Sequence, residues 1–540
     1  MKKYSVAIVV SMAMFILALD TTMMNVAITA LTQDLNTEIQ NIQFAIAFYA
    51  LVMACFMLLG AKLADIFGTK RIFIIGVILY GIGTLTAALS VNVVMLTVGW
   101  SVIEGIGAAL MVPSMVTFLM AAYQGRERMV AFAIFTAVTV GAAAIGPIVG
   151  GLFTTYASWR WAFGMEFFIV VAVLIFSRVL IGQRSRERPK LDFVGVLLSA
   201  LGFGSIVFGV INTVTYGWWE AERPLVVGGL EIAPFGLSIA AVLMMTGGIF
   251  LLLLVFWERR QERKGNEPLI PMSLLKNRPY MAGGMVTLVL QLGIGAILFS
   301  VPFFLQSALF KNAIETGVAV MPLTLAMLLM MLVTPRFAAT VPVKYLTMGG
   351  IVACAAGAIV LARSFSVDMA TTDLIPGFVV FGLGLGLALG QLQNLSLSSA
   401  KPSETEVGAG LFNTFRNLGM SLGTAIVGTL LLTFFLSGLV LGVNGSSVLP
   451  QEDKDELTVL VTQTAREMSR EELEAEIERI LGEYPDEYIQ ELKVIAGDSI
   501  GHSMRVSYYA LGGILGAGFV ASLFLSKRKL VPTPGPAGAT

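Results

Sequence analysis

The sequence has few of the residues on which enzymes and disulfide-bonded secreted proteins depend. Its 540 residues include one histidine and two cysteines, and only 13% of them are charged. Cys55 and Cys354 both lie within apolar runs, so we expect no disulfide. The single histidine, His502, borders a polar segment, and no pair of nucleophile and base stands out. These absences disfavour an enzyme, and we expect neither a cofactor nor a metal.

Two further absences narrow the class of protein. The phosphate-binding pattern G-x-x-x-x-G-K-[ST] does not occur, which disfavours an ATP-driven pump. The formal net charge is zero, and we expect no nucleic-acid partner.

Apolar residues are what the chain has in abundance. They make up 56% of the sequence, with 56 glycines and a mean hydropathy of +0.83, which is typical of a protein that crosses the membrane many times. Runs long enough to span a bilayer predict fourteen transmembrane helices. These runs lie near 6–28, 42–63, 72–90, 93–120, 130–153, 161–181, 193–213, 235–257, 280–302, 317–335, 345–363, 374–397, 407–436 and 504–525.

The distribution of Lys and Arg predicts the orientation. Fourteen spans place both ends on one side, and with that side cytoplasmic the short outer loops hold only Arg160, Arg223, Lys311 and Arg363. We therefore expect a multi-pass plasma-membrane protein with cytoplasmic termini. The run after the N-terminal MKKY is too long for the apolar part of a cleaved signal, so we expect it to remain as the first span.

One long polar segment interrupts this pattern near the C-terminus. Residues 438–502 alternate acidic with apolar residues at helical spacing, which predicts an acidic outer loop of short helices. The negative charge would attract cations to the outer mouth. The alternative is a solvated helical surface with no further role.

The first span contains a carboxylate near its centre. Asp20 lies in MFILALDTTMMNV, and an acid at this depth costs about 3 kcal/mol on insertion scales. Thr21, Thr22 and Asn25 add hydrogen-bonding groups nearby, which suits a path where a proton or cation binds. The alternative is a carboxylate neutralised by a buried partner. We interpret Asp20 as a residue that couples transport to an ion or contacts the substrate.

The loop between the second and third spans carries a recognisable pattern. GAKLADIFGTKR, residues 60–71, resembles the loop motif of the major facilitator superfamily, Gly-x-Leu-Ala-Asp-Arg-x-Gly-Arg-Lys. A tight turn at Gly68 would place Asp65 at a helix end within reach of Lys70 and Arg71. The resemblance implies a gating charge cluster that holds two helix bundles in one arrangement.

A second motif lies in the fifth span. GAAAIGPIVGG, residues 141–151, resembles the antiporter motif of the same superfamily. Gly146, Gly150 and Gly151 allow close helix contact, and Pro147 removes a backbone hydrogen bond so that the helix can bend. We expect this helix to pack where the pathway must seal.

Other segments are similar to the fourteen-span drug:proton antiporter branch of that superfamily. They are LDTTMMNVAITAL (19–31), SWRWAF (158–163), LDFVG (191–195), ERRQERKGNEPLIPMSLLKNR (258–278) and GAGLFNTFRNLGMSLGTAIVG (408–428). Two departures concern coupling. In WSVIEGIGAA (100–109), Ser101 stands where that branch usually has an Arg, and Glu104 stands where it usually has a Gln. Glu166 replaces a usual Asn.

The intramembrane charges are unevenly divided between the two ends of the chain. Asp20, Glu104 and Glu166 fall in the first six spans with no base among them, so burial and mutual repulsion favour their protonated forms. We interpret all three as proton-coupling residues, although Glu166 could instead be a solvated acid near the outer surface. Arg416, in the thirteenth span, is better suited to bind a helix end or an anionic group than a proton.

Polar residues within other spans are candidates for lining the substrate path. We name as substrate-binding candidates Asn25, Gln291, Gln391, Asn413 and Arg416. Hydrogen bonds between helices remain an alternative use for the amide side chains.

These features together predict an all-α polytopic protein with the major facilitator fold and fourteen transmembrane helices. We expect a six-helix bundle at 1–181, two linker spans with cytoplasmic loops at 182–275, and a second six-helix bundle at 276–540 that includes the acidic loop 438–502. The resemblance implies proton-coupled export of amphipathic, cationic drugs or toxic compounds by alternating access. The alternative is a proton-driven exporter of a lipid or an endogenous metabolite. The expected partners are small amphipathic substrates, protons and the lipid bilayer, and we expect a monomer.

Overall fold

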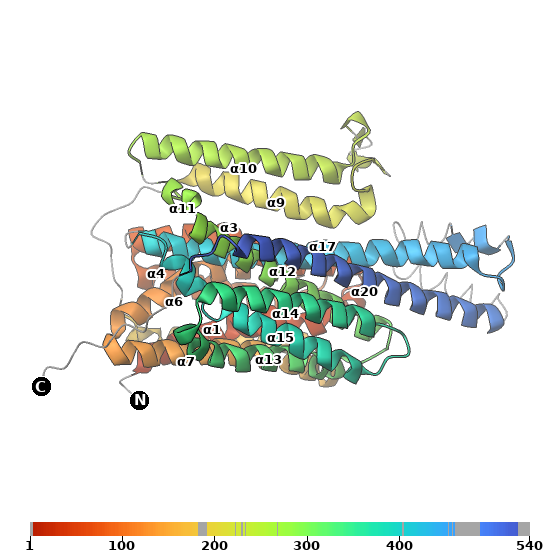
Figure 1. Cartoon of the computed structure of the whole chain (residues 1–540), viewed down its shortest axis with the longest axis horizontal. Coiled ribbons are helices and arrows are strands. Elements are labelled where there is room, and N and C mark those ends of the chain that lie inside the picture. Colours follow the sequence, from red (N-terminus) through yellow and green to blue (C-terminus); the bar gives the residue numbers. More distant parts are fainter. Residues whose placement is uncertain are drawn as a thin grey trace, which may run out of the picture.

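The computed structural model is almost entirely helical (Figure 1). It describes residues 4–181, 192–221, 223–227, 230–232, 234–266, 268–401, 404–451, 453–455, 457–458 and 486–527. The first half contains α1 (Ser5–Met23), η2 (Met24–Val26), α2 (Ile28–Asp34), α3 (Ile39–Phe67), α4 (Thr69–Ala88), α5 (Val93–Leu96), η3 (Thr97–Glu104), α6 (Gly105–Ala122), α7 (Gly125–Tyr156), α8 (Arg160–Phe176) and η4 (Ser177–Val179).

The rest of the chain adds a pair of long helices and a second set. The pair is α9 (Phe193–Tyr216) and α10 (Ile239–Arg263), joined through β1 (Leu225–Val227), β2 (Leu230–Ile232) and η5 (Pro234–Gly236); β1 and β2 form an antiparallel hairpin. The second set is α11 (Met272–Lys276), α12 (Arg278–Ser307), α13 (Ala313–Thr340), α14 (Val343–Ser364), η6 (Thr371–Leu374), α15 (Ile375–Leu389), α16 (Leu392–Leu397), α17 (Thr405–Gly445) and α20 (Asp486–Ser522).

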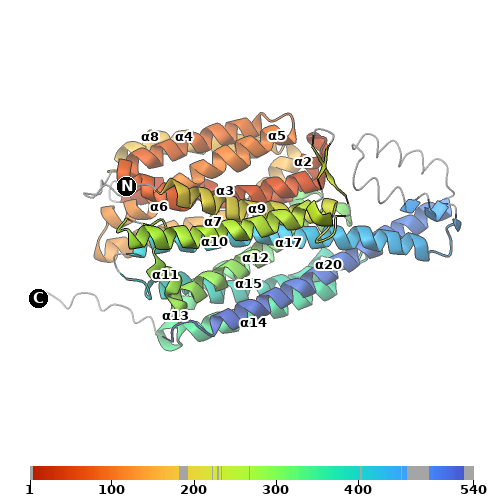
Figure 2. The same ribbon diagram turned by 90° about the horizontal axis from the view of Figure 1, so that it is seen from above.

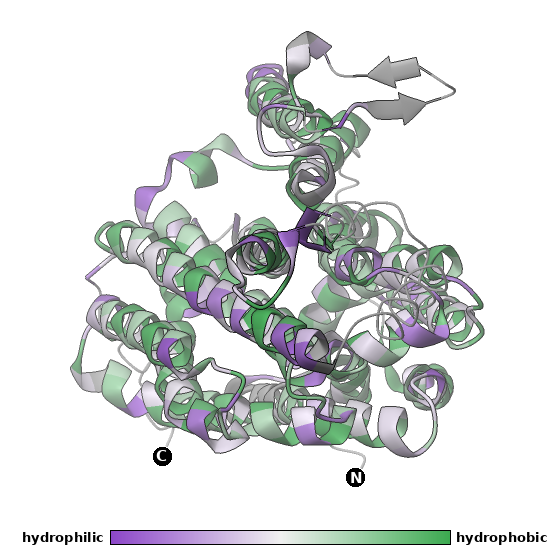
Figure 3. Cartoon of the chain, turned by 90° about the vertical axis from the view of Figure 1, so that its right-hand side faces the viewer, coloured by the Kyte–Doolittle hydropathy of each residue, from purple (hydrophilic) through white to green (hydrophobic). Residues whose placement is uncertain are grey.

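Thirteen helical segments in the described part are long and apolar enough to cross a membrane. They correspond to the first thirteen apolar runs of the sequence, and Figure 3 shows that apolar residues predominate along the helices. The fourteenth predicted run, 504–525, falls on α20, which is not among the thirteen. The polar residues in its first half and the Ser, Tyr and Gly residues in its second half dilute its hydropathy.

The helices divide between two apolar cores. Buried side chains of α1 to α8, together with Phe299 of α12, form one large cluster, and those of α12 to α17 and α20 form another. Figure 2 shows the two groups on opposite sides of the molecule. The helices α9 and α10 pack chiefly against each other, and α9 also contacts α3 and α17. This pair therefore lies at the edge of the molecule, beside the seam between the groups.

Small residues bring the two groups into close contact along that seam. On α7, a side chain at Gly151 would lie 2.6 Å from the Ala313 carbonyl oxygen of α13. On α13, one at Gly317 would lie 2.2 Å from the carbonyl oxygen of Pro147. The α7 and α13 backbones can thus touch only because these positions lack side chains.

A second part of the seam runs along α3 and α17. Gln43 donates to the Thr424 carbonyl (3.0 Å), and Ser421 donates to the Ala47 carbonyl (2.7 Å). Each helix thus supplies one polar side chain and one backbone carbonyl, and these two hydrogen bonds fix how the helices face each other.

The predicted acidic outer loop needs correction at both ends. Residues 438–445 are the last turns of α17, and α20 already begins at Asp486, so these parts belong to two long helices that project together beyond the others (Figure 1). Close contacts of Gly438 with Ser499 and of Gly442 with Ile495 hold the pair side by side. Residues 459–485, where most of the predicted short helices fall, lie outside the described residues.

Candidate functional site

The first span is interrupted just after Asp20. Thr21 and Thr22 donate their hydroxyl groups to the carbonyls of Ala18 (2.9 Å) and Leu19 (3.0 Å), and Asn25 donates to the Thr21 carbonyl (2.9 Å). Side chains that bond back to their own helix tend to bend it. Here α1 changes to the short 3₁₀ helix η2 and then to α2, with Asn25 inside the interruption.

Three acids from three different spans meet inside the first group of helices. Asp20 of α1, Glu104 at the end of η3 and Glu166 of α8 are each 0% exposed. One carboxylate oxygen from each lies within 4.8 Å of those of the other two. We call Asp20, Glu104 and Glu166 the acid triad. The structure thus brings together all three predicted proton-coupling residues, and Glu166 is not a solvated surface acid.

Neutral donors surround the acid triad. The indole nitrogen of Trp100 donates to both Asp20 oxygens (3.1 Å each), Thr84 donates to Glu104 (3.1 Å) and Tyr80 to Glu166 (3.4 Å). The Oε1 atoms of Glu104 and Glu166 are buried without a hydrogen-bond partner. No described Lys or Arg forms an ion pair with these acids, so Asp20 is not neutralised by a base.

Close packing of α4 against the fourth span sets these distances. A side chain at Gly83 would lie 2.6 Å from Cβ of Glu104, and one at Gly107 would lie 2.5 Å from the backbone nitrogen of Tyr80. The π-helix η3 carries both Trp100 and Glu104 toward the interior. Such π turns occur frequently at functional sites.

Three carboxyl groups so close together cannot all be ionised in an apolar interior. Repulsion and lost hydration both oppose the second and third negative charges. The unpartnered oxygens of Glu104 and Glu166 can share a proton with each other, or each can take up a proton of its own. The arrangement can therefore bind and release protons, or hold a small cation among its oxygens.

A small cavity lies between the two groups of helices, separated from the triad by Trp100. Its volume is about 20 Å³, enough for one water molecule. The residues that line it are Thr21, Asn25, Ile46, Tyr49, Ala50, Met53, Trp100, Gly295, Leu298, Asn417, Met420 and Thr424. The rings of Tyr49 and Trp100 stack with centroids 5.6 Å apart. Trp100 thus forms part of the cavity wall and also binds Asp20.

The predicted substrate-binding residues are dispersed. Asn25 lines the cavity. Gln291 is buried on α12 against Gly419 of α17. Asn413 donates to the Ala409 carbonyl of its own helix (3.0 Å).

The remaining two candidates also differ in setting. Gln391 lies at the break between α15 and α16, where it accepts from Asn394 (2.9 Å). Arg416 of α17 has accessible surface within the protein and no hydrogen-bond or ion-pair partner among the described residues.

The predicted gating loop is one residue long. Gly68 alone separates α3 from α4, with φ of +96°, a conformation that favours glycine. Lys70 donates to the Arg178 carbonyl at the end of α8 (3.4 Å), and Arg71 is exposed. The Asp65 side chain lies outside the described part of the structure.

The predicted antiporter motif packs on α1 next to Asp20. A side chain at Gly146 would lie 1.9 Å from the Thr22 hydroxyl, and one at Gly150 would lie 2.3 Å from the Met23 carbonyl. Gly151 and Pro147 face α13 instead, as described above. The motif therefore contacts both groups of helices within three turns.

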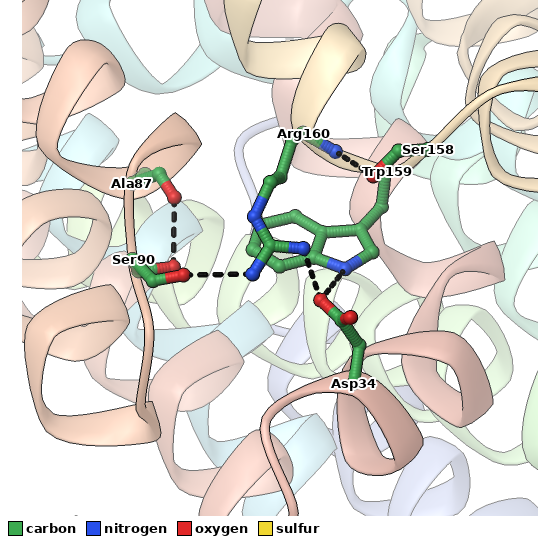
Figure 4. Close-up of polar contacts among 6 residues, drawn as sticks. All are labelled: Asp34, Ala87, Ser90, Ser158, Trp159 and Arg160. Carbon is green, nitrogen blue, oxygen red and sulfur yellow. Dashed lines mark hydrogen bonds and ion pairs between the residues drawn. The ribbon is translucent and has the colours of Figure 1, made fainter.

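A polar cluster at the far end of the first group was not predicted (Figure 4). Arg160 forms an ion pair with Asp34 and donates to the Ser90 carbonyl (2.8 Å). Trp159 also donates to Asp34 (3.0 Å), and the guanidinium lies 4.4 Å from its ring centroid. This cluster ties α8 to the ends of α2 and α4.

The aromatic and hydroxyl partners of the acid triad were also missed. Trp100, Tyr49, Tyr80 and Thr84 are buried in spans where such residues are common, so composition alone did not single them out. The available signal was WSVIE, which places a tryptophan one helical turn before an intramembrane acid.

Comparisons with known proteins agree with this architecture. The family model described as Major Facilitator Superfamily matches residues 10–195 and 192–424. The chain is 30% identical over 431 residues to a cephamycin export protein of Amycolatopsis lactamdurans, covering 77% of this chain and 82% of that protein. It is 28% identical over 424 residues to a probable actinorhodin transporter of Streptomyces coelicolor, covering 76% of this chain and 69% of that protein.

Solved structures show the same fold at low sequence identity. A POT family peptide transporter matches with a TM-score of 0.57 and 14% identity, covering 98% of this chain and 99% of that one. A D-xylose-proton symporter matches with a TM-score of 0.56 and 12% identity, covering 79% of this chain and 90% of that one. With its family model matched over most of its length, this chain is a multi-pass membrane protein that belongs to the Major Facilitator Superfamily.

Proposed function

We propose that this protein is a secondary active transporter that exports small amphipathic compounds in exchange for protons, by alternating access of a central cavity. The relatives named above as an export protein and a transporter, together with a puromycin resistance protein of Streptomyces alboniger at 27% identity, support export of foreign or toxic compounds.

The position of Trp100 is the observation that carries this proposal. Its ring faces the cavity between the two groups of helices, and its indole nitrogen binds Asp20 of the acid triad. A substrate entering the cavity would press on Trp100 and alter the hydrogen bonds that hold Asp20. Proton binding at the triad and substrate binding in the cavity would then exclude or promote each other, as coupled exchange requires.

The remaining predicted parts fit roles in the same cycle. The six-two-six division, with boundaries near 181 and 275, makes the two groups of helices the moving bundles and α9 with α10 the linker. Gly146, Pro147, Gly150 and Gly151 would seal the seam, and Asp65, Gly68, Lys70 and Arg71 would stabilise one state of it. With α20 as the fourteenth span, both termini are cytoplasmic. Its packing on α12, α14 and α17 supports this assignment.

Purified protein in lipid vesicles tests the function. With an acidic interior, vesicles carrying wild-type protein should accumulate an amphipathic dye, either a cationic rhodamine ester or the anionic fluorescein, and collapsing the pH gradient should stop the uptake. Protein-free vesicles control for passive dye entry. A fluorescent phospholipid tested in the same way distinguishes a lipid exporter. Uptake that is indifferent to the gradient would refute proton coupling.

A further inference from the structure

The side chain of Arg416 lies at the level of the central cavity. Two hydrogen bonds between α17 and α3 bracket it: Thr414 donates to the Ala54 carbonyl (3.3 Å), and Ser421 donates to the Ala47 carbonyl (2.7 Å). Between these bonds α3 presents Tyr49, Ala50 and Met53, which line the cavity. Arg416 is therefore near the middle of the seam and not at a membrane surface.

Arg416 remains accessible although its helix is surrounded by other helices. α17 packs against α3, α9, α12 and α20. The residue nevertheless keeps accessible surface although protein surrounds it on all sides, and it forms no hydrogen bond or ion pair with any described residue. An unpaired guanidinium is costly at this depth unless it reaches water or a ligand. We therefore place Arg416 at an aqueous extension of the cavity.

Neutral polar groups continue the cavity surface beside Arg416. Asn417 of α17 lines the cavity, and Asn413 lies one turn before Arg416. A guanidinium offers five N–H donors in a planar fork that matches a carboxylate or another anionic oxygen pair. Amides beside it can donate to the remaining oxygens.

Among the described residues, no acid lines the cavity. The cavity lining contains no Asp or Glu, and the acid triad is fully buried behind Trp100. A cationic substrate would find aromatic rings there but no exposed counter-charge, whereas an anionic group would find Arg416.

We propose that the cavity, which in this structure has room for one water molecule and widens when the two groups of helices move apart, takes amphipathic aromatic compounds that carry an acidic group, such as a carboxylate or an ionised phenol. Arg416 binds the anionic oxygens, and Tyr49 with Trp100 stacks on the aromatic body. This inference rests on the proposed export function but narrows the substrate to a class opposite in charge to that expected from the sequence.

Binding of two dyes with the same xanthene core tests the charge preference. Fluorescein is anionic, and the rhodamine ester is cationic. We measure both affinities by fluorescence anisotropy with full-length protein in lipid nanodiscs. Wild-type protein should bind fluorescein more tightly, with an affinity that weakens as salt rises.

Substitution of Arg416 should change the binding affinities of the two dyes to different extents. Arg416→Gln should weaken fluorescein binding by roughly tenfold or more, since a charge-assisted hydrogen bond is lost, and should leave the rhodamine ester within about twofold. Arg416→Lys should retain part of the fluorescein affinity, because it keeps the charge but not the fork. Arg505→Gln is the matched control, since Arg505 is exposed on α20 and bonds only to the Gly501 carbonyl of its own helix.

The outcomes distinguish this inference from the export proposal. Equal weakening of both dyes by Arg416→Gln, or rhodamine binding without fluorescein binding in the wild type, overturns the anion site. If a pH gradient still drives transport of the rhodamine ester in that case, the proposed export function stands and only the anion site is refuted. Selective loss of fluorescein binding in a protein that moves neither dye along a gradient supports the site and contradicts coupled export.

Discussion

Trp100 is the residue through which the acid triad and the central cavity meet. Its ring packs between Tyr49 and Phe163, and its single N–H is shared by both oxygens of Asp20. The donor is neutral and fixed, so it stabilises an ionised Asp20 without removing the possibility of protonation. A base at the same place would hold Asp20 permanently ionised.

Removal of the Asp20 charge should uncouple transport. Asp20→Asn cannot release a proton, so uptake driven by a pH gradient should be abolished, while downhill exchange of substrate across vesicles persists. Asp373→Asn is the matched control, because Asp373 is exposed and accepts only from the nearby Ala370 nitrogen. Gradient-driven uptake by Asp20→Asn at the wild-type rate would exclude Asp20 as the coupling residue.

Neutralising Glu104 should change the pH at which transport is fastest. Its carboxylate repels an ionised Asp20, so Glu104→Gln removes an interaction that favours the protonated state of the pair. We expect the pH optimum for vesicle uptake to move downward. Proton release on substrate binding, followed in detergent from pH 5 to 9, is the direct check. An unchanged profile in the Asp20→Asn, Glu104→Gln double mutant would shift attention to Glu166.

At the scale of the element, α7 is the helix that contacts both groups across their seam. Gly146 and Gly150 allow it to approach α1, while Pro147 and Gly151 meet α13. Movement of the two groups must therefore slide or open contacts that leave no room for a side chain. Backbone contacts of this kind can separate without breaking many hydrogen bonds, which suits a seal that opens and closes.

A single methyl group should distinguish sealing glycines from others on α7. Gly151→Ala would place Cβ 2.6 Å from the Ala313 carbonyl oxygen, so the α7–α13 contact should open and vesicles should leak substrate without a gradient. Gly141→Ala meets nothing within 4 Å and should leave transport unchanged. It should raise stability by about 0.5–1 kcal/mol through helix propensity. Comparable leaks in both variants would mean that contact at Gly151 does not seal the path.

Sequence patterns predicted the helices better than the site. Apolar runs were long enough to locate thirteen spans, and Gly68 marked the turn between α3 and α4 because few residues adopt its positive φ. The three acids were visible as costly residues in apolar runs. Their mutual repulsion was expected because all three fall in the first six spans. Their meeting within 4.8 Å could not be predicted, because depth along a helix does not specify which face it presents to its neighbours. Nor could the sequence indicate that Trp100 would screen the acids from the cavity while Arg416 stayed accessible.

For the whole molecule, the crossing of α20 decides where the C-terminus lies. Cysteines placed singly at Lys264, Gln451 and Lys527 sample three exposed positions, after α10, after α17 and after α20. We expect an impermeant thiol reagent in intact cells to label only Gln451→Cys. The native Cys55 and Cys354 are buried, so their background reaction should be low. Labelling of Lys527→Cys from outside would mean that α20 does not cross, and labelling of Lys264→Cys would refute the proposed orientation.

The length of α17 has a mechanical consequence. Its 41 residues extend about 60 Å at 1.5 Å per residue, roughly twice the thickness of the hydrocarbon core. Joined to α20 by Gly438 and Gly442, the projecting part is a stiff lever anchored in the second group of helices. A small tilt of that group at the seam becomes a larger displacement at the lever's tip, in proportion to its distance from the pivot. Outside the bilayer, this tip offers an amplified readout of the conformational cycle, accessible to spectroscopic labels that never enter the transport path.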